Sequence, residues 1–266
     1  MENNLEVKNL VCGYSQFKLD QLSFSIKKGD FAGIIGPNGS GKTTLIKGIR
    51  GEVNVEKGSI LLDGKDLRMM SIKEKSTKMA VVTQQTDDCD LSVLDFVLLG
   101  RLPYRRPFQF FESDEDLKIA NKYIKLTGIE RLRDKSISQL SGGERQLASI
   151  AKALTQEPTL LLLDEPTSQL DICHQVQILD LVRQLNQDMQ LTVLMIIHDL
   201  NLASEYCDHL LMMNHGQIFI QGTPEEVIQY QAIEEVYQTC VVTRENPVSG
   251  KPTVFLVSQN KLTRKK

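Results

Sequence analysis

The sequence has little of what membrane spans, disulfide-linked domains or structural zinc sites require. No apolar stretch approaches the roughly 20 residues that a helix needs to cross a bilayer. The first residues, Met1-Glu2-Asn3-Asn4, lack the basic start and the apolar run of a secretory signal. The five cysteines are scattered and form no C-x-x-C pair; they are Cys12, Cys89, Cys173, Cys207 and Cys240. We therefore expect reduced thiols in a cytosol and no bilayer span in this chain.

A broad basic surface is also missing. The formal net charge is -3 and the isoelectric point is about 5.9, which argues against a protein that wraps a nucleic-acid backbone. The only basic run, at residues 264–266, favours a solvated terminus. With 41% hydrophobic and 24% charged residues, the composition is that of an ordinary globular protein without repeats. A length of 266 residues favours a single domain over 1–266 that carries an inserted subdomain.

The apolar pattern changes along the chain from alternating to continuous. Residues 5–8 and 22–26 alternate between apolar and polar side chains, which predicts antiparallel strands. The continuous apolar run 31–35 precedes glycines and a helical pattern at 44–49, which predicts a buried parallel strand leading into a helix. Further buried strands are predicted at 79–82, 160–163 and 192–197. Because helical stretches separate these strands, the predicted fold class is α/β, with a mostly parallel sheet and an N-terminal antiparallel β-subdomain.

Two segments interrupt or extend this pattern. Residues 86–157 are charged and helical in pattern, with Pro103 and Pro107 near their start, and we interpret them as an inserted α-helical subdomain. Further on, apolar residues on both sides of the turn Asn214-His215-Gly216 predict a hairpin. Residues 223–266 form a C-terminal extension, in which Thr223-Pro224-Glu225-Glu226 predicts a capped helix start.

A glycine-rich segment between the first buried strand and its helix matches the phosphate-loop pattern G-x-x-x-x-G-K-[ST]. Its residues are Gly36, Pro37, Asn38, Gly39, Ser40, Gly41, Lys42 and Thr43, with Thr44 following in the helix. Glycines allow successive N–H groups and the helix N-terminus to approach phosphate oxygens closely. Lys42 is expected to reach the β- and γ-phosphates of ATP, and the Thr43 hydroxyl to bind Mg²⁺. The alternative is a glycine-rich turn with an ordinary surface lysine.

Two adjacent carboxylates follow the run of four leucines at 160–163. Asp164 and Glu165 would stand at the carboxyl end of a buried strand, the edge at which open α/β sheets bind ligands. Asp164 is suited to hold Mg²⁺ through water, and Glu165 to activate the attacking water as a general base. Either residue alone could also be a turn acid before Pro166.

The segment Leu140-Ser141-Gly142-Gly143-Glu144-Arg145-Gln146 resembles the signature sequence of ABC ATPases. A serine and two glycines that open a helix can bind an anion, and the chain already has a phosphate loop for its own nucleotide. The resemblance implies that two copies pack head to tail, with Ser141, Gly142 and Gly143 of one copy facing the γ-phosphate held by the other. A capped helix start without a ligand is the alternative.

Four further positions match this family in order along the chain. Tyr14 resembles the aromatic residue that stacks on adenine, and His198 the switch histidine that bonds the γ-phosphate. Gln84 resembles the glutamine that contacts Mg²⁺ and the catalytic water, although Gln85 is an alternative because the register is open by one residue. Asp171 resembles the aspartate of the loop that crosses the dimer interface, where Gln169 replaces the common alanine.

Three less specific segments resemble the ATPases of iron-siderophore, haem and cobalamin importers. They are residues 100–104, 170–175 and 222–227. The resemblance implies an ATP hydrolase with Mg²⁺ that forms a homodimer at the cytoplasmic face of the cell (inner) membrane. Its other partners would be two membrane permease subunits and, indirectly, a substrate-binding protein. Importers of molybdate or other chelates, a soluble ABC ATPase acting on nucleic acid or ribosomes, and a regulatory module that binds nucleotide without hydrolysing it are the alternatives.

Overall fold

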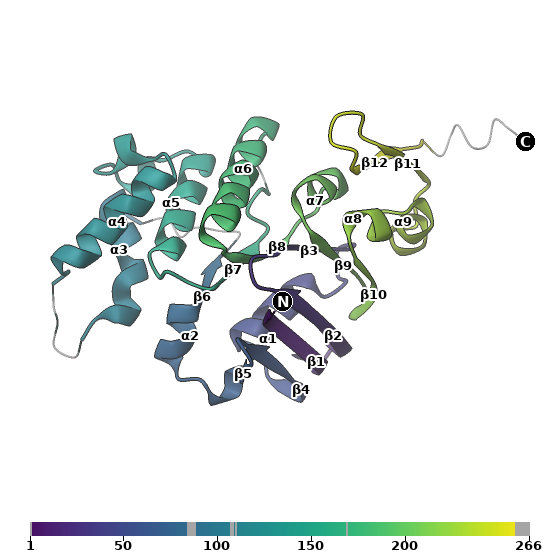
Figure 1. Cartoon of the computed structure of the whole chain (residues 1–266), viewed down its shortest axis with the longest axis horizontal. Helices are drawn as coiled ribbons and strands as arrows, with labels where there is room; N and C mark the ends of the chain where they lie inside the picture. The colour runs from purple at the N-terminus through teal and green to yellow at the C-terminus, as the bar shows by residue number, and fades with distance from the viewer. Residues whose placement is uncertain (1, 84–88, 107–108, 110, 169, 259–266) are drawn as a thin grey trace, which may run out of the picture. The chain divides into compact units, whose positions relative to one another are not determined.

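The chain divides into two compact units, which are described separately. One unit comprises Met1–Leu67 and Leu194–Lys266, and the other comprises Arg68–Val193. The computed structural model describes every residue except 1, 84–88, 107–108, 110, 169 and 259–266 (Figure 1). No helix in the described part of the chain is long and apolar enough to cross a membrane.

An antiparallel sheet forms the start of the first unit. It has the order β2-β1-β4-β5, with β1 at Asn3–Tyr14, β2 at Phe17–Lys27, β4 at Val55–Leu62 and β5 at Lys65–Asp66 (Figure 1). Val7 of β1 lies opposite Phe24 on one side and Ile60 on the other. All three side chains are buried, because the alternation of apolar residues puts one face of each strand in the core. The predicted N-terminal β-subdomain is confirmed.

A further strand of this unit, β3 at Phe31–Ile35, is fully buried. Strand β9, at His209–Asn214, runs parallel to β3 and antiparallel to β10, at Gln217–Gly222. The turn between β9 and β10 contains His215 and Gly216, both with positive φ, as a two-residue hairpin requires. The unit also contains α1 at Lys42–Arg50, α7 at Leu200–Tyr206, α8 at Pro224–Val227, α9 at Tyr230–Tyr237, β11 at Val241–Glu245 and β12 at Pro252–Leu256.

The second unit carries a parallel strand pair and most of the helices. Strand β6, at Met79–Val82, pairs in parallel with β7, at Leu160–Asp164, and β8, at Thr192–Ile196, runs from this unit into the first. The α-helices are α2 at Ile72–Lys78, α3 at Val93–Leu98, α4 at Asp114–Leu126, α5 at Gly142–Leu154 and α6 at Ile172–Met189. The 3₁₀ turns of this unit are η2 at Leu99–Tyr104, η3 at Glu130–Leu132 and η4 at Ile137–Gln139, while η1, at Leu67–Met69, begins at the last residue of the preceding segment of the first unit.

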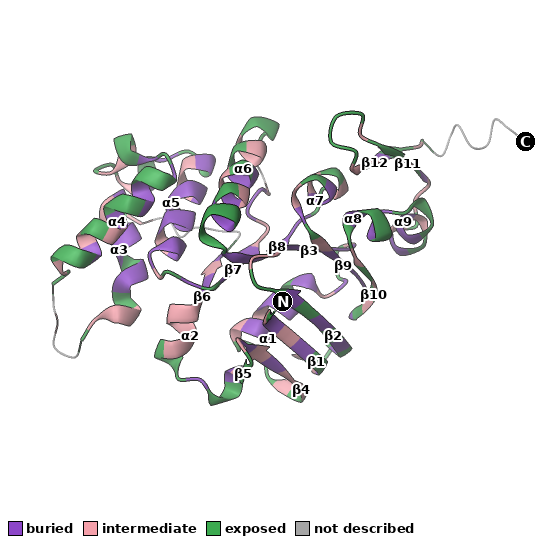
Figure 2. Cartoon of the chain, in the orientation of Figure 1, coloured by how far each residue is buried: buried purple, intermediate pink, exposed green. Residues whose placement is uncertain are grey.

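The α/β prediction is therefore confirmed, because parallel and antiparallel strands occur together with helices. Figure 2 shows that buried residues run along the strands and along one side of several helices. The predicted boundaries of the helical insertion, 86–157, and of the C-terminal extension, 223–266, stay predictions. The capped helix start at Thr223 is present as α8, whose first turn closes a capping box between Thr223 and Glu226.

A buried arginine forms hydrogen bonds between helical segments of the second unit. Arg101 on η2 is 6% exposed and donates to Asp116 Oδ1 at 2.9 Å, to the Thr155 carbonyl at 2.7 Å and to Glu157 Oε2 at 3.2 Å. Its guanidinium also lies 3.8 Å from the centre of the Tyr104 ring. Arg101 therefore joins η2 to the first turn of α4 and to the end of α5.

Two neighbouring residues of η2 also contact the end of α5. A Cβ on Gly100 would stand 2.0 Å from Thr155 Oγ1, so η2 can approach the end of α5 this closely only with glycine there. Tyr104 donates its hydroxyl to the Gln156 carbonyl at 2.7 Å. The residues at 100–104 that the sequence analysis compared with importer ATPases thus have a structural role in packing.

Candidate functional site

The phosphate loop follows β3 directly and ends at the first turn of α1. Gly36, Gly39 and Gly41 have φ values of 146°, 79° and 106°, which side chains with a Cβ rarely adopt. A Cβ on Gly36 would stand 2.3 Å from the Met213 carbonyl oxygen, and one on Gly41 would stand 2.6 Å from Leu19 Cδ2. The backbone of the loop is therefore fixed closely against β9 and β2.

Lys42 turns back over this loop. It is 5% exposed, and its Nζ donates to the carbonyls of Gly36 at 2.8 Å and Pro37 at 3.0 Å. The Ser40 N–H donates to the Pro37 carbonyl at 3.2 Å, which closes the loop into a tight turn. The ammonium group is therefore held beside the turn that its own sequence motif forms, as phosphate binding by this lysine requires.

The residues of the loop fit a polyphosphate group. Ser40 Oγ is one of the buried side-chain atoms in the described residues without a hydrogen-bond partner, and it lies near Gly36 inside the turn. Asn38, Gly39 and Thr43 are exposed, so that the tip of the loop and the first turn of α1 are open to a ligand. Helix α1 has no acidic residue in its first turn, which leaves its positive end available for an anion.

Three contacts that the sequence analysis missed support the loop from elsewhere in the first unit. The Gly216 N–H, in the turn between β9 and β10, donates to the Ser40 carbonyl at 2.9 Å. The Phe17 ring packs 3.0 Å from the position of a Cβ on Gly41. Burial raises the pKa of Tyr237, the last residue of α9, to about 12, and the nearby backbone of Gly36 acts against this shift. No local pattern identifies these residues, because each contact joins segments that are distant in sequence.

Two other predicted residues lie at strand ends of the same unit. His198 is exposed and follows β8, and the preceding N–H of Ile197 donates to the Ile34 carbonyl of β3 at 3.1 Å. His198 therefore follows a strand end that is bonded to β3, the strand that leads into the phosphate loop. Tyr14 is 50% exposed at the end of β1 and pairs with Phe17, the residue that packs against Gly41. Both positions are compatible with contacts to a nucleotide bound at the loop.

The carboxylate pair lies in the second unit, at the end of β7. Asp164 is the last residue of the strand, and Glu165 follows with a φ of 53°, a left-handed conformation that is strained for a residue other than glycine. The Ser168 N–H and hydroxyl both donate to the Glu165 carbonyl, at 3.1 and 2.9 Å. This turn fixes the direction in which Glu165 leaves the strand. Gln84, predicted to join these acids, lies outside the described residues, two positions after β6 ends at Val82.

The predicted signature opens α5 as a capped helix. Ser141 Oγ accepts from the Glu144 N–H at 3.3 Å, and Glu144 Oε2 accepts from the Ser141 N–H at 2.8 Å. The bonds from Ser141 hold the pKa of Glu144 below its usual value. Gly142 and Gly143 form the first turn, so their N–H groups lie at the positive end of a helix of 13 residues. A capped start and an anion site are compatible here, because the cap uses a different N–H group.

Asp171 begins α6 and belongs to the same unit. Its Oδ1 accepts from the His174 N–H at 2.9 Å, and its Oδ2 lies 2.8 Å from His174 Nδ1. The backbone bond from His174, followed by the bond to its ring, lowers the pKa of Asp171. Gln175 Nε2 donates to the carbonyls of Thr167 and Leu170, which fixes the loop ahead of the helix. Gln169, the departure noted within this loop, is outside the described residues.

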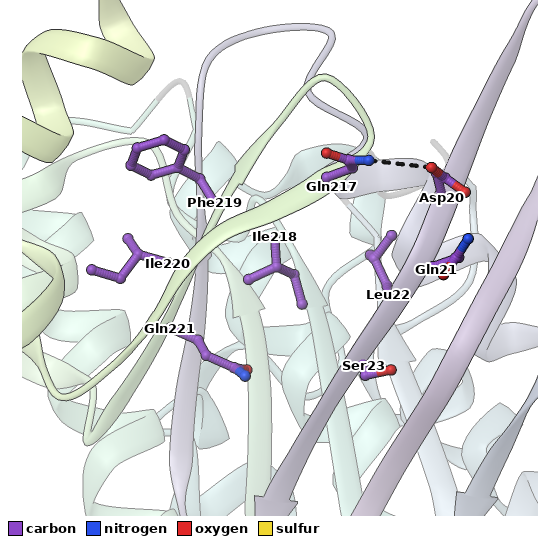
Figure 3. Close-up of a pocket in the computed structure, with 9 residues that line it drawn as sticks. All are labelled: Asp20, Gln21, Leu22, Ser23, Gln217, Ile218, Phe219, Ile220 and Gln221. Atoms are coloured by element: carbon purple, nitrogen blue, oxygen red, sulfur yellow. Dashed lines mark hydrogen bonds between the residues drawn. The ribbon is translucent and has the colours of Figure 1, made fainter.

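A separate pocket of about 560 Å³ lies between β2 and β10 of the first unit (Figure 3). Its lining residues are Asp20, Gln21, Leu22, Ser23, Gln217, Ile218, Phe219, Ile220 and Gln221. Gln217 Nε2 donates to Asp20 Oδ2 across its upper end at 3.2 Å (Figure 3). The lining has one carboxylate and no lysine or arginine, so this pocket lacks the positive charge that binding of a triphosphate requires.

Comparisons with known proteins point to one family. A family model described as ABC transporter matches residues 19–168, more than half of the chain. The ferric enterobactin transport ATP-binding protein FepC of Escherichia coli is 36% identical over 252 residues, covering 94% of this chain and 93% of that protein. The petrobactin import ATP-binding protein FpuD of Bacillus anthracis is 35% identical over 268 residues, and the match covers 100% of this chain and 97% of FpuD.

Solved structures agree with these sequence relationships. An inward-facing metal-chelate type ABC transporter aligns with a TM-score of 0.85 and 26% identity, covering 97% of this chain and 99% of the other. The dimeric post-hydrolysis state of the ATP-binding cassette MJ0796, bound to ADP and Pi, aligns with a TM-score of 0.72 and 27% identity, covering 82% and 98%.

Proposed function

Because this chain belongs to the ABC transporter family, we propose that it is the ATP-binding and ATP-hydrolysing subunit of an importer for a metal chelate, with an iron-siderophore, haem or cobalamin as cargo. The observation that carries the proposal is a single chain with two glycine-rich helix starts, each of which is suited to bind an anion. One is the phosphate loop with Lys42 held over it, and the other is the signature start of α5. A subunit that binds one nucleotide needs only the first, so the second is free to serve another copy.

The phosphate loop would bind the triphosphate of ATP through its N–H groups and the Lys42 ammonium. Bound Mg²⁺ would neutralise charge on the β- and γ-phosphates. The Thr43 hydroxyl and the Asp164 carboxylate are the oxygen ligands that we assign to it, with Gln84 as a further ligand expected from the sequence. The exposed Tyr14 ring would stack on adenine.

Glu165 is the group that we assign to proton removal from the attacking water. The turn that Glu165 forms with Ser168 fixes the backbone of Glu165 just after β7. A general base must be positioned within hydrogen-bond reach of the proton that it removes. His198 would bond the γ-phosphate and orient the same water. Lys42 would stabilise the negative charge that develops during transfer.

We assign the active form to a homodimer in which Ser141, Gly142 and Gly143 of one copy face the γ-phosphate bound by the other. A dimer is known for a structural relative, the ATP-binding cassette MJ0796 bound to ADP and Pi, and this supports a dimeric active form. Asp171 stands at the loop that would cross between copies. Closing of the dimer would then complete each site only when both nucleotides are present.

The remaining partners follow from the relatives. FepC is named for ferric enterobactin transport and FpuD for petrobactin import, which favours an iron chelate as cargo. We propose two permease subunits, a substrate-binding protein that acts through them, and a peripheral position on the cytoplasmic face of the cell (inner) membrane. These two relatives favour the importer over the alternative of an ATPase acting on nucleic acid or ribosomes.

Replacement of the proposed base tests the assignment directly. Glu165→Gln should leave the Kd for ATP within about 2-fold of the parent and lower turnover by at least about 100-fold, the contribution typical of a general base. The variant should also accumulate as an ATP-bound dimer in size-exclusion chromatography. Glu235→Gln, an exposed glutamate on α9, is the matched control and should keep parental turnover. Turnover at the parental rate in Glu165→Gln would exclude Glu165 as the base.

Affinity purification from native membranes tests the transport role. A multi-helix permease recovered with the chain would support the importer, and the accompanying binding protein would identify the cargo. Recovery with ribosomal or DNA-bound proteins and no permease would overturn the transport proposal and leave the ATPase assignment intact.

A further inference from the structure

One side chain in the second unit contacts both the loop that precedes α6 and the signature start of α5. His174 Nδ1 lies 2.8 Å from Asp171 Oδ2, while the His174 N–H donates to the other oxygen of the same carboxylate at 2.9 Å. The carboxylate therefore caps α6 and also fixes the direction of the imidazole ring one turn later.

The other side of the ring lies against the signature. A Cβ built on Gly143 would stand 2.7 Å from His174 Cδ2 and 3.2 Å from Cγ, which is closer than carbon atoms approach without movement. Gly143 has no positive φ, so its backbone conformation does not require glycine. Within this chain the need for glycine at position 143 comes from the histidine ring beside it.

The loop that ends at Asp171 is anchored on its other side as well. Gln175, also on the first turns of α6, donates to the Thr167 carbonyl at 3.2 Å and to the Leu170 carbonyl at 3.0 Å. The loop, the start of α6 and the start of α5 are thus connected through two adjacent side chains, and the His174 ring is the group that passes a shift of Asp171 to Gly143. Leu170 of the same loop lies beside Gly142, 3.5 Å from the position of a Cβ there, and adds a second contact.

We propose that His174 is a positioning residue that couples the Asp171 loop to the signature glycine Gly143, so that the two segments move as one body when the dimer closes. The inference rests on the proposed function, in which both segments serve the nucleotide of the partner copy. Neither segment belongs to the phosphate loop. Loss of the coupling therefore affects closure and turnover, and leaves the first binding of ATP to the phosphate loop unchanged.

The kinetic test uses the full chain in the assembly in which the parent hydrolyses ATP. His174→Ala should lower kcat by about 10-fold, because a small displacement of a positioned group already costs this much. The Kd for ATP in the monomer should stay within about 2-fold of the parent. General destabilisation of the fold would not lower kcat and leave the Kd unchanged in this way. Gln177→Ala, an exposed position on the same helix, is the matched control and should keep the parental kcat.

A second variant separates the two contacts of the ring. His174→Phe keeps an aromatic ring beside Gly143 and loses the bond to Asp171, so kcat should stay several-fold below that of the parent. Full recovery in this variant would overturn the coupling, because Asp171 would then play no part. A parental kcat in His174→Ala would overturn it too.

Thermal unfolding tests the contact without activity. Gly143→Ala should lower the melting temperature because the new methyl group meets His174, and the double variant Gly143→Ala/His174→Ala should recover much of that loss. Simple addition of the two single losses would refute the contact. A parent without ATPase activity would instead refute the proposed function, and the inference that rests on it would fall as well.

Discussion

Arg101 offers a test of how the helical part of the second unit is held together. The guanidinium is almost completely buried, and it bonds Asp116, the Thr155 carbonyl and Glu157 while it stacks on the Tyr104 ring. Arg101→Met removes all of these interactions but keeps an unbranched apolar side chain in the same space. The main cost arises because Asp116, itself buried, is left without its cation.

The size of this effect follows from burial. Removal of one partner from a buried ion pair typically costs about 3–5 kcal/mol, and we expect a loss of about 4 kcal/mol in the free energy of unfolding. The matched control is Arg133→Ala, because Arg133 also bonds a carboxylate, Asp134, but at the surface. Its loss should stay below about 1 kcal/mol. The double variant Arg101→Met/Asp116→Leu should recover most of the stability, except for about 1 kcal/mol from the lost helix cap at Ser113.

Urea unfolding followed by far-UV circular dichroism measures these differences, because the chain has no tryptophan to report by fluorescence. Two outcomes would refute the reasoning. One is a loss of less than about 1 kcal/mol in Arg101→Met, which would mean that the ion pair is not buried in solution. The other is a double variant that is no more stable than Arg101→Met alone, which would mean that the unpaired Asp116 is not the source of the cost.

The same variant carries a pH prediction. Burial raises the pKa of Asp116, but the hydrogen bonds from Ser113 and Arg101 together outweigh it and hold the pKa below its usual value. A carboxylate with a lowered pKa in the folded state stabilises the protein above its unfolded pKa, about 4, and this contribution disappears as the pH falls through the folded value. The difference in stability between the parent and Arg101→Met should therefore shrink as the pH is lowered from 7 into the acid range.

Two further predictions concern the phosphate loop. Gly36→Ala should abolish detectable ATP binding by isothermal titration calorimetry, because its Cβ would stand 2.3 Å from the Met213 carbonyl oxygen. Gly39→Ala has no atom within 4 Å of its Cβ and should only weaken ATP binding, through backbone strain. Equal effects of the two substitutions would contradict the steric argument. Tyr237→Phe removes the half-buried hydroxyl beside the Gly36 backbone and should raise the KM for ATP several-fold with little change in kcat, whereas Tyr230→Phe, on the exposed side of α9, should change neither.

The sequence predicts those features whose cause is local. The strand that leads to the phosphate loop is a continuous apolar run, and the loop has its glycines at fixed spacing, so both are visible in 13 consecutive residues from Phe31 to Thr43. The hairpin at His215 and Gly216 and the capped start at Thr223 are equally local, and both are confirmed.

Features that depend on distant contacts were not predictable in this way. An arginine normally faces solvent, and only the approach of α4 and the end of α5 makes Arg101 a buried residue. His174 was noted only as part of a family-like segment, because its contact with Gly143 joins two helices whose starts are far apart in sequence. The assignments of Glu165, His198 and the signature to catalysis stay predictions until the variants are measured.

The contacts of Gly36 also have a consequence for the order in which the protein can form during synthesis. The loop begins at Gly36, yet the carbonyl that confines it belongs to Met213 and the side chain beside its backbone belongs to Tyr237. A ribosome-bound chain that has already exposed the entire nucleotide motif therefore still lacks the walls that hold it in shape. Competence to bind ATP should arise only after Met213 and Tyr237 have both emerged, so that chains truncated or stalled before these residues cannot sequester the nucleotide.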